Sequence, residues 1–156
     1  MSIFFSSKNY RNLFKLFKSI KLMKKFLIIH GPNMNFIGLK SAKDGSRITI
    51  DKIDRSLRKK AKELEVALKI LRTHDESKAV AFVQRNRKIT NGIIISPTSW
   101  HKGAYVLSDT LHFLEIPYNI VSITETCDTL FNQGKIFYNK DVIISYAKAL
   151  ADICKK

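Results

Sequence analysis

The chain has 156 residues, and its hydrophobic content of 45% is enough to fill the core of one domain. Its 28 Lys and Arg residues outnumber 13 Asp and Glu residues, so the formal net charge is +15 and an anionic partner is expected. Cys127 and Cys154 are too few for a disulfide framework, and no apolar run reaches the roughly 18 residues that a membrane-spanning helix needs.

Basic residues are concentrated at the N-terminus. Residues 1–43 contain nine Lys or Arg and no acid, so more than half of the excess charge lies in the first quarter of the chain. Basic and apolar side chains there each recur every three or four positions: Lys8, Arg11, Lys15 and Lys18, and Tyr10, Leu13, Phe14 and Phe17. This pattern predicts a basic amphipathic helix.

Residues 1–23 are therefore interpreted as an N-terminal arm or a targeting segment. Serine is also frequent and acids are absent, a composition typical of transit peptides, which predicts delivery to the mitochondrial matrix. The alternatives are a retained arm that binds a partner and an ordinary solvated helix. Without a targeting function of this segment, the expected location is the cytoplasm.

Residues 24–156 alternate strand signals with helix signals. The predicted strands are residues 25–30, 66–72, 92–96 and 118–124, and the predicted helices are 49–64, 76–87, 104–114 and 141–154. Repeated strand-helix units predict one α/β domain with a three-layer architecture, in which helices cover both faces of a parallel sheet. Ligands of such sheets bind beyond the carboxyl ends of the strands.

Titratable side chains in this part have structural interpretations. His30 ends an apolar strand and is expected to be a hydrogen-bonded core residue, while Asp75 and Glu76 stand at a helix start, where they cap the helix. The four histidines have no metal-ligand spacing. The sequence therefore predicts neither a metal nor another cofactor.

Four motifs resemble the type II 3-dehydroquinases. The most specific is the loop Gly31-Pro32-Asn33-Met34-Asn35-Phe36-Ile37-Gly38, and the others are at 92–97, 107–111 and 116–117. The resemblance covers about residues 24–152. It implies a flavodoxin-like fold, and it also implies a homo-oligomer, since the family is usually a dodecamer of trimers.

The resemblance implies an enzyme that dehydrates 3-dehydroquinate through an enolate, with a Tyr base activated by an Arg and with a His acid. The family's loop Asn is present as Asn33. The Arg and Tyr positions fall on Lys40 and Gly45, and the His position falls on Lys102, one residue after His101. Further substrate-binding positions are also changed, to Ser96, Ile120, Ser122, Thr124, Glu125 and Asn132.

These replacements predict a non-catalytic, dehydroquinase-like protein, a pseudoenzyme. Together with the net charge and the targeting-like start, they predict a structural or binding component of a mitochondrial assembly, a ribosomal protein that contacts RNA and other proteins of the assembly. The alternative is a divergent 3-dehydroquinate dehydratase of the shikimate pathway that uses His101 or Lys102 as its acid.

Two groups of residues are candidates for RNA contacts besides Arg11, Lys15 and Lys18 of the arm. Arg58, Lys59 and Lys62 lie on the outer face of a predicted helix, where they form either a solvated face or a phosphate-binding patch. Trp100, His101 and Lys102 combine an aromatic ring with basic groups, an arrangement that suits base stacking, although Trp100 is equally explained by packing.

Overall fold

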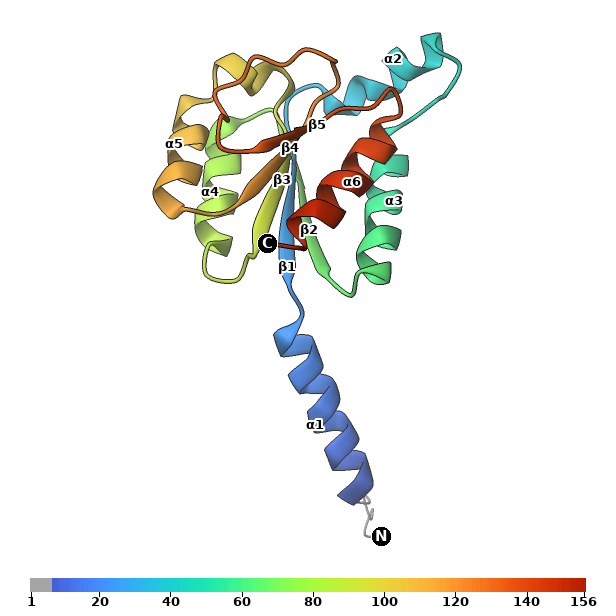
Figure 1. The fold of residues 1–156 in the computed structure, drawn as a ribbon, viewed down its shortest axis with the longest axis vertical. Helices are drawn as coiled ribbons and strands as arrows, with labels where there is room; N and C mark the ends of the chain where they lie inside the picture. The colour runs from blue at the N-terminus through green and yellow to red at the C-terminus, as the bar shows by residue number, and fades with distance from the viewer. Residues whose placement is uncertain (1–6) are drawn as a thin grey trace.

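The computed structural model describes residues 7–156, which form a parallel five-stranded sheet with helices on both faces (Figure 1). The strands lie in the order β2-β1-β3-β4-β5: β1 is Lys25–His30, β2 Ala67–Arg72, β3 Gly92–Ser96, β4 Tyr118–Val121 and β5 Lys135–Phe137. The helices are α1 (Ser7–Leu22), α2 (Ile37–Lys43), α3 (Ile50–Glu63), α4 (Glu76–Asn86), α5 (Tyr105–Leu114) and α6 (Val142–Ile153), with short 3-10 helices η1 (Met34–Phe36) and η2 (Thr98–Lys102). The predicted three-layer α/β fold is confirmed.

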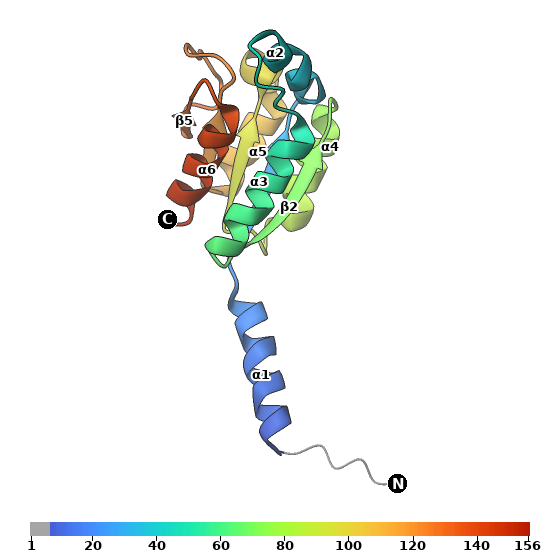
Figure 2. The same cartoon turned by 90° about the vertical axis from the view of Figure 1, so that its right-hand side faces the viewer.

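Strand β1 shows how the layers are held together. Phe26 and Ile28 point into a core shared with α3 and α6, while Leu27 and Ile29 point into a second core shared with α4 and α5. All four side chains are buried, because alternate residues of a central strand face opposite layers that are both covered. Figures 1 and 2 show the two helix pairs on opposite sides of the sheet.

Side-chain hydrogen bonds cap the N-termini of three helices. Thr49 accepts a hydrogen bond from the backbone of Lys52, Asp75 from Ser77, and Asp141 from Ile143. Each bond satisfies a backbone N–H group that has no partner inside its helix. The predicted capping role of Asp75 and the predicted helix start at Thr49 are confirmed.

The loops after β1 and β4 differ from the prediction. Helix α2 forms where a loop was expected, and β4 ends at Val121, because the Ser122 hydroxyl donates to the carbonyl oxygen of Thr124 (2.7 Å) and turns the chain. Strand β5 was not predicted, since its three residues are at most half-buried and carry no apolar alternation.

Helix α1 extends away from the domain at the end of the sheet where β1 begins (Figures 1 and 2). Only Met23 and Lys24 separate its last residue from β1. In residues 7–156 no helix has the length and hydropathy required to cross a bilayer.

Candidate functional site

The loops that follow β1 and β3 are tied together at the carboxyl edge of the sheet. The backbone N–H of Gly31 donates to the carbonyl oxygen of Ser96 (2.9 Å), and the Thr98 hydroxyl donates to the carbonyl oxygen of Pro32. A Cβ atom at Gly31 would lie 2.6 Å from the Ser96 oxygen, so only glycine permits this approach. The two loops therefore form one rigid rim.

A chain of hydrogen-bonded side chains lies beneath this rim, and all of it except Arg72 is buried. The Ser96 hydroxyl bonds the Tyr146 hydroxyl, which lies 2.7 Å from Nδ1 of His30. Nε2 of His30 lies 2.7 Å from Asp54, whose second oxygen accepts from Nε (3.0 Å) and Nη2 (2.6 Å) of Arg72. The prediction that His30 is a hydrogen-bonded core residue is confirmed, and the chain joins β1, β2 and β3 to α3 and α6.

The charges in this network are compensated. Burial raises the pKa of the Asp54 carboxyl, but hydrogen bonds from His30 and Arg72 outweigh it, so that pKa lies below its usual value. Burial also raises the pKa of Tyr146 beyond its usual range. Tyr146 thus stays protonated and enclosed, which suits a structural role and not proton transfer to a ligand.

A cavity of about 660 Å³ opens at the same edge, between α2, the end of the β4 loop and the segment that joins β5 to α6. Its volume lies within the roughly 300–1,000 Å³ of small-molecule sites. The lining residues are Ile37, Lys40, Ser41, Asp44, Ser46, Ile48, Ile123, Tyr138, Asn139, Lys140, Asp141 and Val142.

Three groups in this lining suit a small anionic ligand. Lys40 comes from α2, where its ammonium group donates to the carbonyl oxygen of Ile123 (3.2 Å), while Tyr138 and Lys140 come from the loop before α6. Asp141 is occupied as the cap of α6, and Ser41 bonds the backbone of Ile48. Two ammonium groups and a phenol, from α2 and from the loop before α6, therefore surround one space, whose lining also includes Asp44.

His101 and Lys102 lie outside the lining of this cavity. A ring nitrogen of His101 lies 3.3 Å from the sulfur of Cys127, and Lys102 forms an exposed ion pair with Asp128 (3.1 Å). Burial lowers the pKa of His101 and raises the pKa of the Cys127 thiol, although a hydrogen bond from Ser122 opposes the second shift. Both shifts favour the neutral forms of the imidazole and the thiol.

The structure places the other predicted site residues as follows. Asn33 is exposed in the left-handed conformation (φ 64°), and its backbone N–H donates to His74 (3.2 Å). Gly45, also left-handed, forms the turn after α2. Trp100 is buried in the core beneath α4 and α5, so its ring packs inside the domain.

Four of the basic residues predicted to contact an anion line the same groove. Lys15 and Lys18 of α1 line a groove of about 880 Å³ with Arg58 and Lys62 of α3. Arg11 and Lys59 are exposed but are not part of its lining.

Sequence reasoning missed Tyr138 and Lys140 as site residues, and it missed Asp54 and Tyr146 as partners of His30. Asp141 is a recognisable helix cap, so it marks where the segment before α6 ends at the carboxyl edge. No sequence pattern near Tyr138, however, indicates that this residue lies close to Lys40. Among residues 7–156 no cluster of His, Cys, Asp or Glu has the arrangement of a metal site.

Comparison with known proteins gives one family. The sequence model described as "Dehydroquinase class II" matches residues 24–149. A relative named 3-dehydroquinate dehydratase, from Endomicrobium trichonymphae, is 33% identical over 95 residues, which are 61% of this chain and 66% of that protein. Another of the same name, from Halothermothrix orenii, is 26% identical over 80% of this chain and 81% of its own length.

The fold comparison agrees. The crystal structure of a type II dehydroquinase from Butyrivibrio crossotus superposes with a TM-score of 0.75 at 18% identity, and covers 84% of this chain and 97% of its own.

The prediction of a non-catalytic component of a mitochondrial ribosome that binds RNA is wrong. The matched family and the named relatives are enzymes, and no comparison links the chain to a ribosomal assembly. The pseudoenzyme interpretation assumed that chemistry must stay at fixed sequence positions. The structure instead brings Lys40 of α2 to one cavity with Tyr138 and Lys140 of the loop before α6. The mitochondrial location, the anionic partner and the oligomer stay predictions.

Proposed function

The chain belongs to the class II dehydroquinase family, and from this premise we propose that it is a 3-dehydroquinate dehydratase. The observation that carries the proposal is the cavity at the carboxyl edge of the sheet, where Lys40, Tyr138 and Lys140 meet. All three lie within the segment that matches the family, and the carboxyl edge is where parallel α/β sheets bind their ligands.

The substrate is a small cyclic carboxylate, so a site for it needs positive charge and a group that moves a proton. Lys40 and Lys140 supply two ammonium groups that bind the carboxylate and stabilise the enolate. Once the phenol proton of Tyr138 has been lost to solvent, the phenolate oxygen takes the proton from C2 and the enolate forms. The hydroxyl then leaves as water with a proton from the Lys140 ammonium group. Lys140 is two residues from Tyr138, so one short segment carries both proton-transfer groups.

The test follows the ultraviolet absorbance of the conjugated product with the full chain at high concentration. Tyr138→Phe should lower kcat by about 10²- to 10⁴-fold, the usual contribution of a general base. Tyr105→Phe is the matched control, because Tyr105 is 62% exposed on α5 and lies outside the cavity lining. Its activity should equal that of the unchanged chain.

A folded chain that forms no product would contradict the proposal. Turnover that survives Tyr138→Phe but is lost in His101→Ala would move the chemistry to the His101–Cys127 pair, and the assignment of the cavity would then be wrong.

A further inference from the structure

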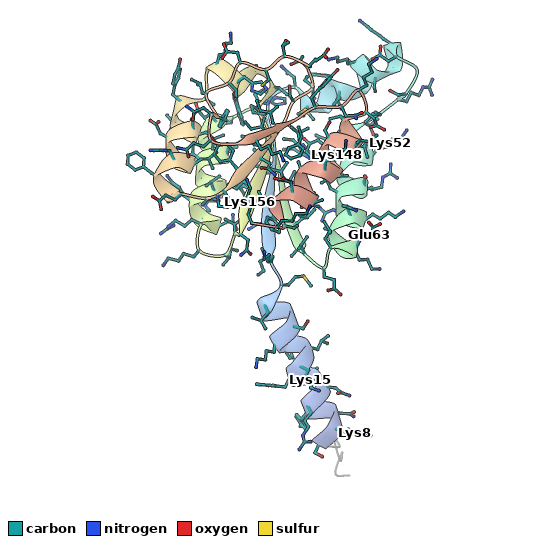
Figure 3. The ribbon with its side chains drawn as sticks, in the orientation of Figure 1. Lys8, Lys15, Lys52, Glu63, Lys148 and Lys156 are labelled. Atoms are coloured by element: carbon teal, nitrogen blue, oxygen red, sulfur yellow. The ribbon has the colours of Figure 1, made fainter. Side chains whose placement is uncertain are left out.

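Helix α1 leaves a continuous apolar surface uncovered. Leu13, Phe14, Leu16 and Phe17 are between 50% and 71% exposed. Leu13 precedes Leu16 by three positions and Phe17 by four, and Phe14 precedes Phe17 by three, so the four residues share one side of the helix. Figure 3 shows Lys8 and Lys15 on α1, below the labelled side chains of α3 and α6, and no layer of the domain runs alongside the helix.

The opposite side of α1 is cationic. Lys15 and Lys18 face the groove shared with α3, whereas the four exposed apolar residues are not part of its lining. Arg58 and Lys62 continue the positive surface onto the domain. Thus Lys15 and Lys18 lie on the side of the helix that borders the groove, and the four exposed apolar residues lie outside the groove.

We propose that α1 docks the protein onto an anionic lipid bilayer, with the helix lying in the plane of the membrane surface. An interfacial helix combines an apolar face, which enters the boundary of the acyl chains, with Lys and Arg, which contact anionic headgroups. Helix α1 has both features, and residues 1–43 contain no acid that would repel the headgroups.

Other occupants suit this surface less well. RNA would pair with the basic side of α1 but would leave Phe14 and Phe17 in water. A second copy would cover the apolar side, yet it would bring the five basic residues of one α1 helix beside the five of another. A bilayer satisfies both sides of the helix at once.

The candidate site lies far from this helix. Helix α1 adjoins the end of the sheet where β1 starts, and the cavity with Lys40 and Tyr138 opens at the carboxyl edge, at the opposite end of the domain (Figure 1). The residues that would contact the membrane are therefore separate from those that line the cavity.

The test is sedimentation of the full chain with vesicles of phosphatidylcholine alone or with about one third phosphatidylglycerol. Binding is expected only with the anionic lipid and should weaken as salt rises. Lys15→Gln with Lys18→Gln should weaken it by about 25-fold, since each basic residue contributes about fivefold at such a surface. Phe14→Ser with Phe17→Ser should weaken it by at least about tenfold.

Matched controls lie far from α1. Phe113→Ser removes an aromatic ring that is 82% exposed on α5, and Lys43→Gln with Lys78→Gln removes two exposed charges from the opposite end of the domain. Both should bind vesicles like the unchanged chain. Thermal unfolding of every variant checks that the domain is intact.

Three results would overturn the proposal. The first is vesicle binding that the α1 variants do not change. The second is binding to a homopolymeric RNA without binding to vesicles, which would make α1 a nucleic-acid arm. The third is self-association that the Phe variants abolish, again without vesicle binding, which would make a second copy the occupant.

Discussion

The imidazole of His30 and the carboxylate of Asp54 form a buried hydrogen bond of 2.7 Å that fastens strand β1 to helix α3. Arg72, at the end of β2, contacts the other oxygen of the same carboxylate. Asp54 therefore bonds one residue of β1 and one of β2, and it ties both strands to α3 at the edge that carries the candidate site.

Replacement of Asp54 by Asn should lower the free energy of unfolding by about 1–3 kcal/mol, because the buried His30 loses its carboxylate partner and Arg72 loses an ion pair. Asp51→Asn is the matched control. Asp51 pairs with the same Arg72 (2.7 Å), but its side chain is 70% exposed, so its loss should cost less than about 1 kcal/mol. Urea unfolding measures both, and equal losses would contradict a special role for Asp54.

Stability should depend on pH through Asp54. Its pKa is lower in the folded state than in the unfolded state, where it is about 3.9. Folding is therefore favoured by this group above about pH 4, and that contribution is lost as the pH falls through the folded value. Urea unfolding from pH 7 to about pH 3 should show a steeper decline in the unchanged chain than in Asp54→Asn, and parallel curves would contradict the assignment.

The contact between Gly31 and the β3 loop predicts that alanine at Gly31 destabilises the fold much more than alanine at Gly103. In Gly31→Ala the new Cβ would lie 2.6 Å and 2.8 Å from the backbone oxygens of Ser96 and Pro97, so a loss of more than about 2 kcal/mol is expected. Gly103→Ala meets nothing closer than 4.0 Å and should unfold almost like the unchanged chain. Similar midpoints in thermal unfolding of the two variants would contradict the prediction, because they would show that the two loops can move apart without loss of stability.

Removal of the Lys40 charge should affect substrate binding. Lys40→Met deletes one of the two ammonium groups of the cavity, and kcat/KM should fall by about 10- to 100-fold, mainly through KM. Lys43→Met, on the same helix but outside the cavity lining, is the control. Steady-state kinetics separate the two parameters, and an unchanged KM would place the carboxylate elsewhere.

The Cys127 thiol should react slowly despite the neighbouring His101. Burial raises its pKa above the ordinary 9.0, so the thiolate that reacts is scarce near neutral pH. In Cys154→Ser, which leaves Cys127 as the one thiol, the rate of alkylation by iodoacetamide should still be rising above pH 9. A plateau near neutral pH would instead reveal a thiolate stabilised by His101.

The sequence was sufficient to predict the central strands and the helices that cover them. Runs such as residues 92–96 are uniformly apolar, and capping residues such as Thr49 and Asp75 mark helix starts within one or two positions. Strand β5 escaped because three residues at the sheet edge bury too little surface to leave a pattern. Helix α2 escaped because its short sequence has a glycine, Gly38, at its second position.

The candidate site was less predictable, since it depends on contacts between distant segments. Position-by-position comparison with the family assigned chemistry to Gly45, a residue without a side chain in a left-handed turn. The tyrosine that reaches the cavity, Tyr138, follows the unpredicted strand β5. Its position beside α2 arises from the order of strands in the sheet, which no local pattern contains.

The short connection between α1 and β1 limits how far the start of the sheet can stand from any surface that holds the helix. Two linking residues span at most about 7 Å. The Debye length at physiological ionic strength is about 8 Å. The charges of Lys24 and Lys25 would therefore stay within the negative potential of the lipid headgroups that hold α1, and they would add to the attraction.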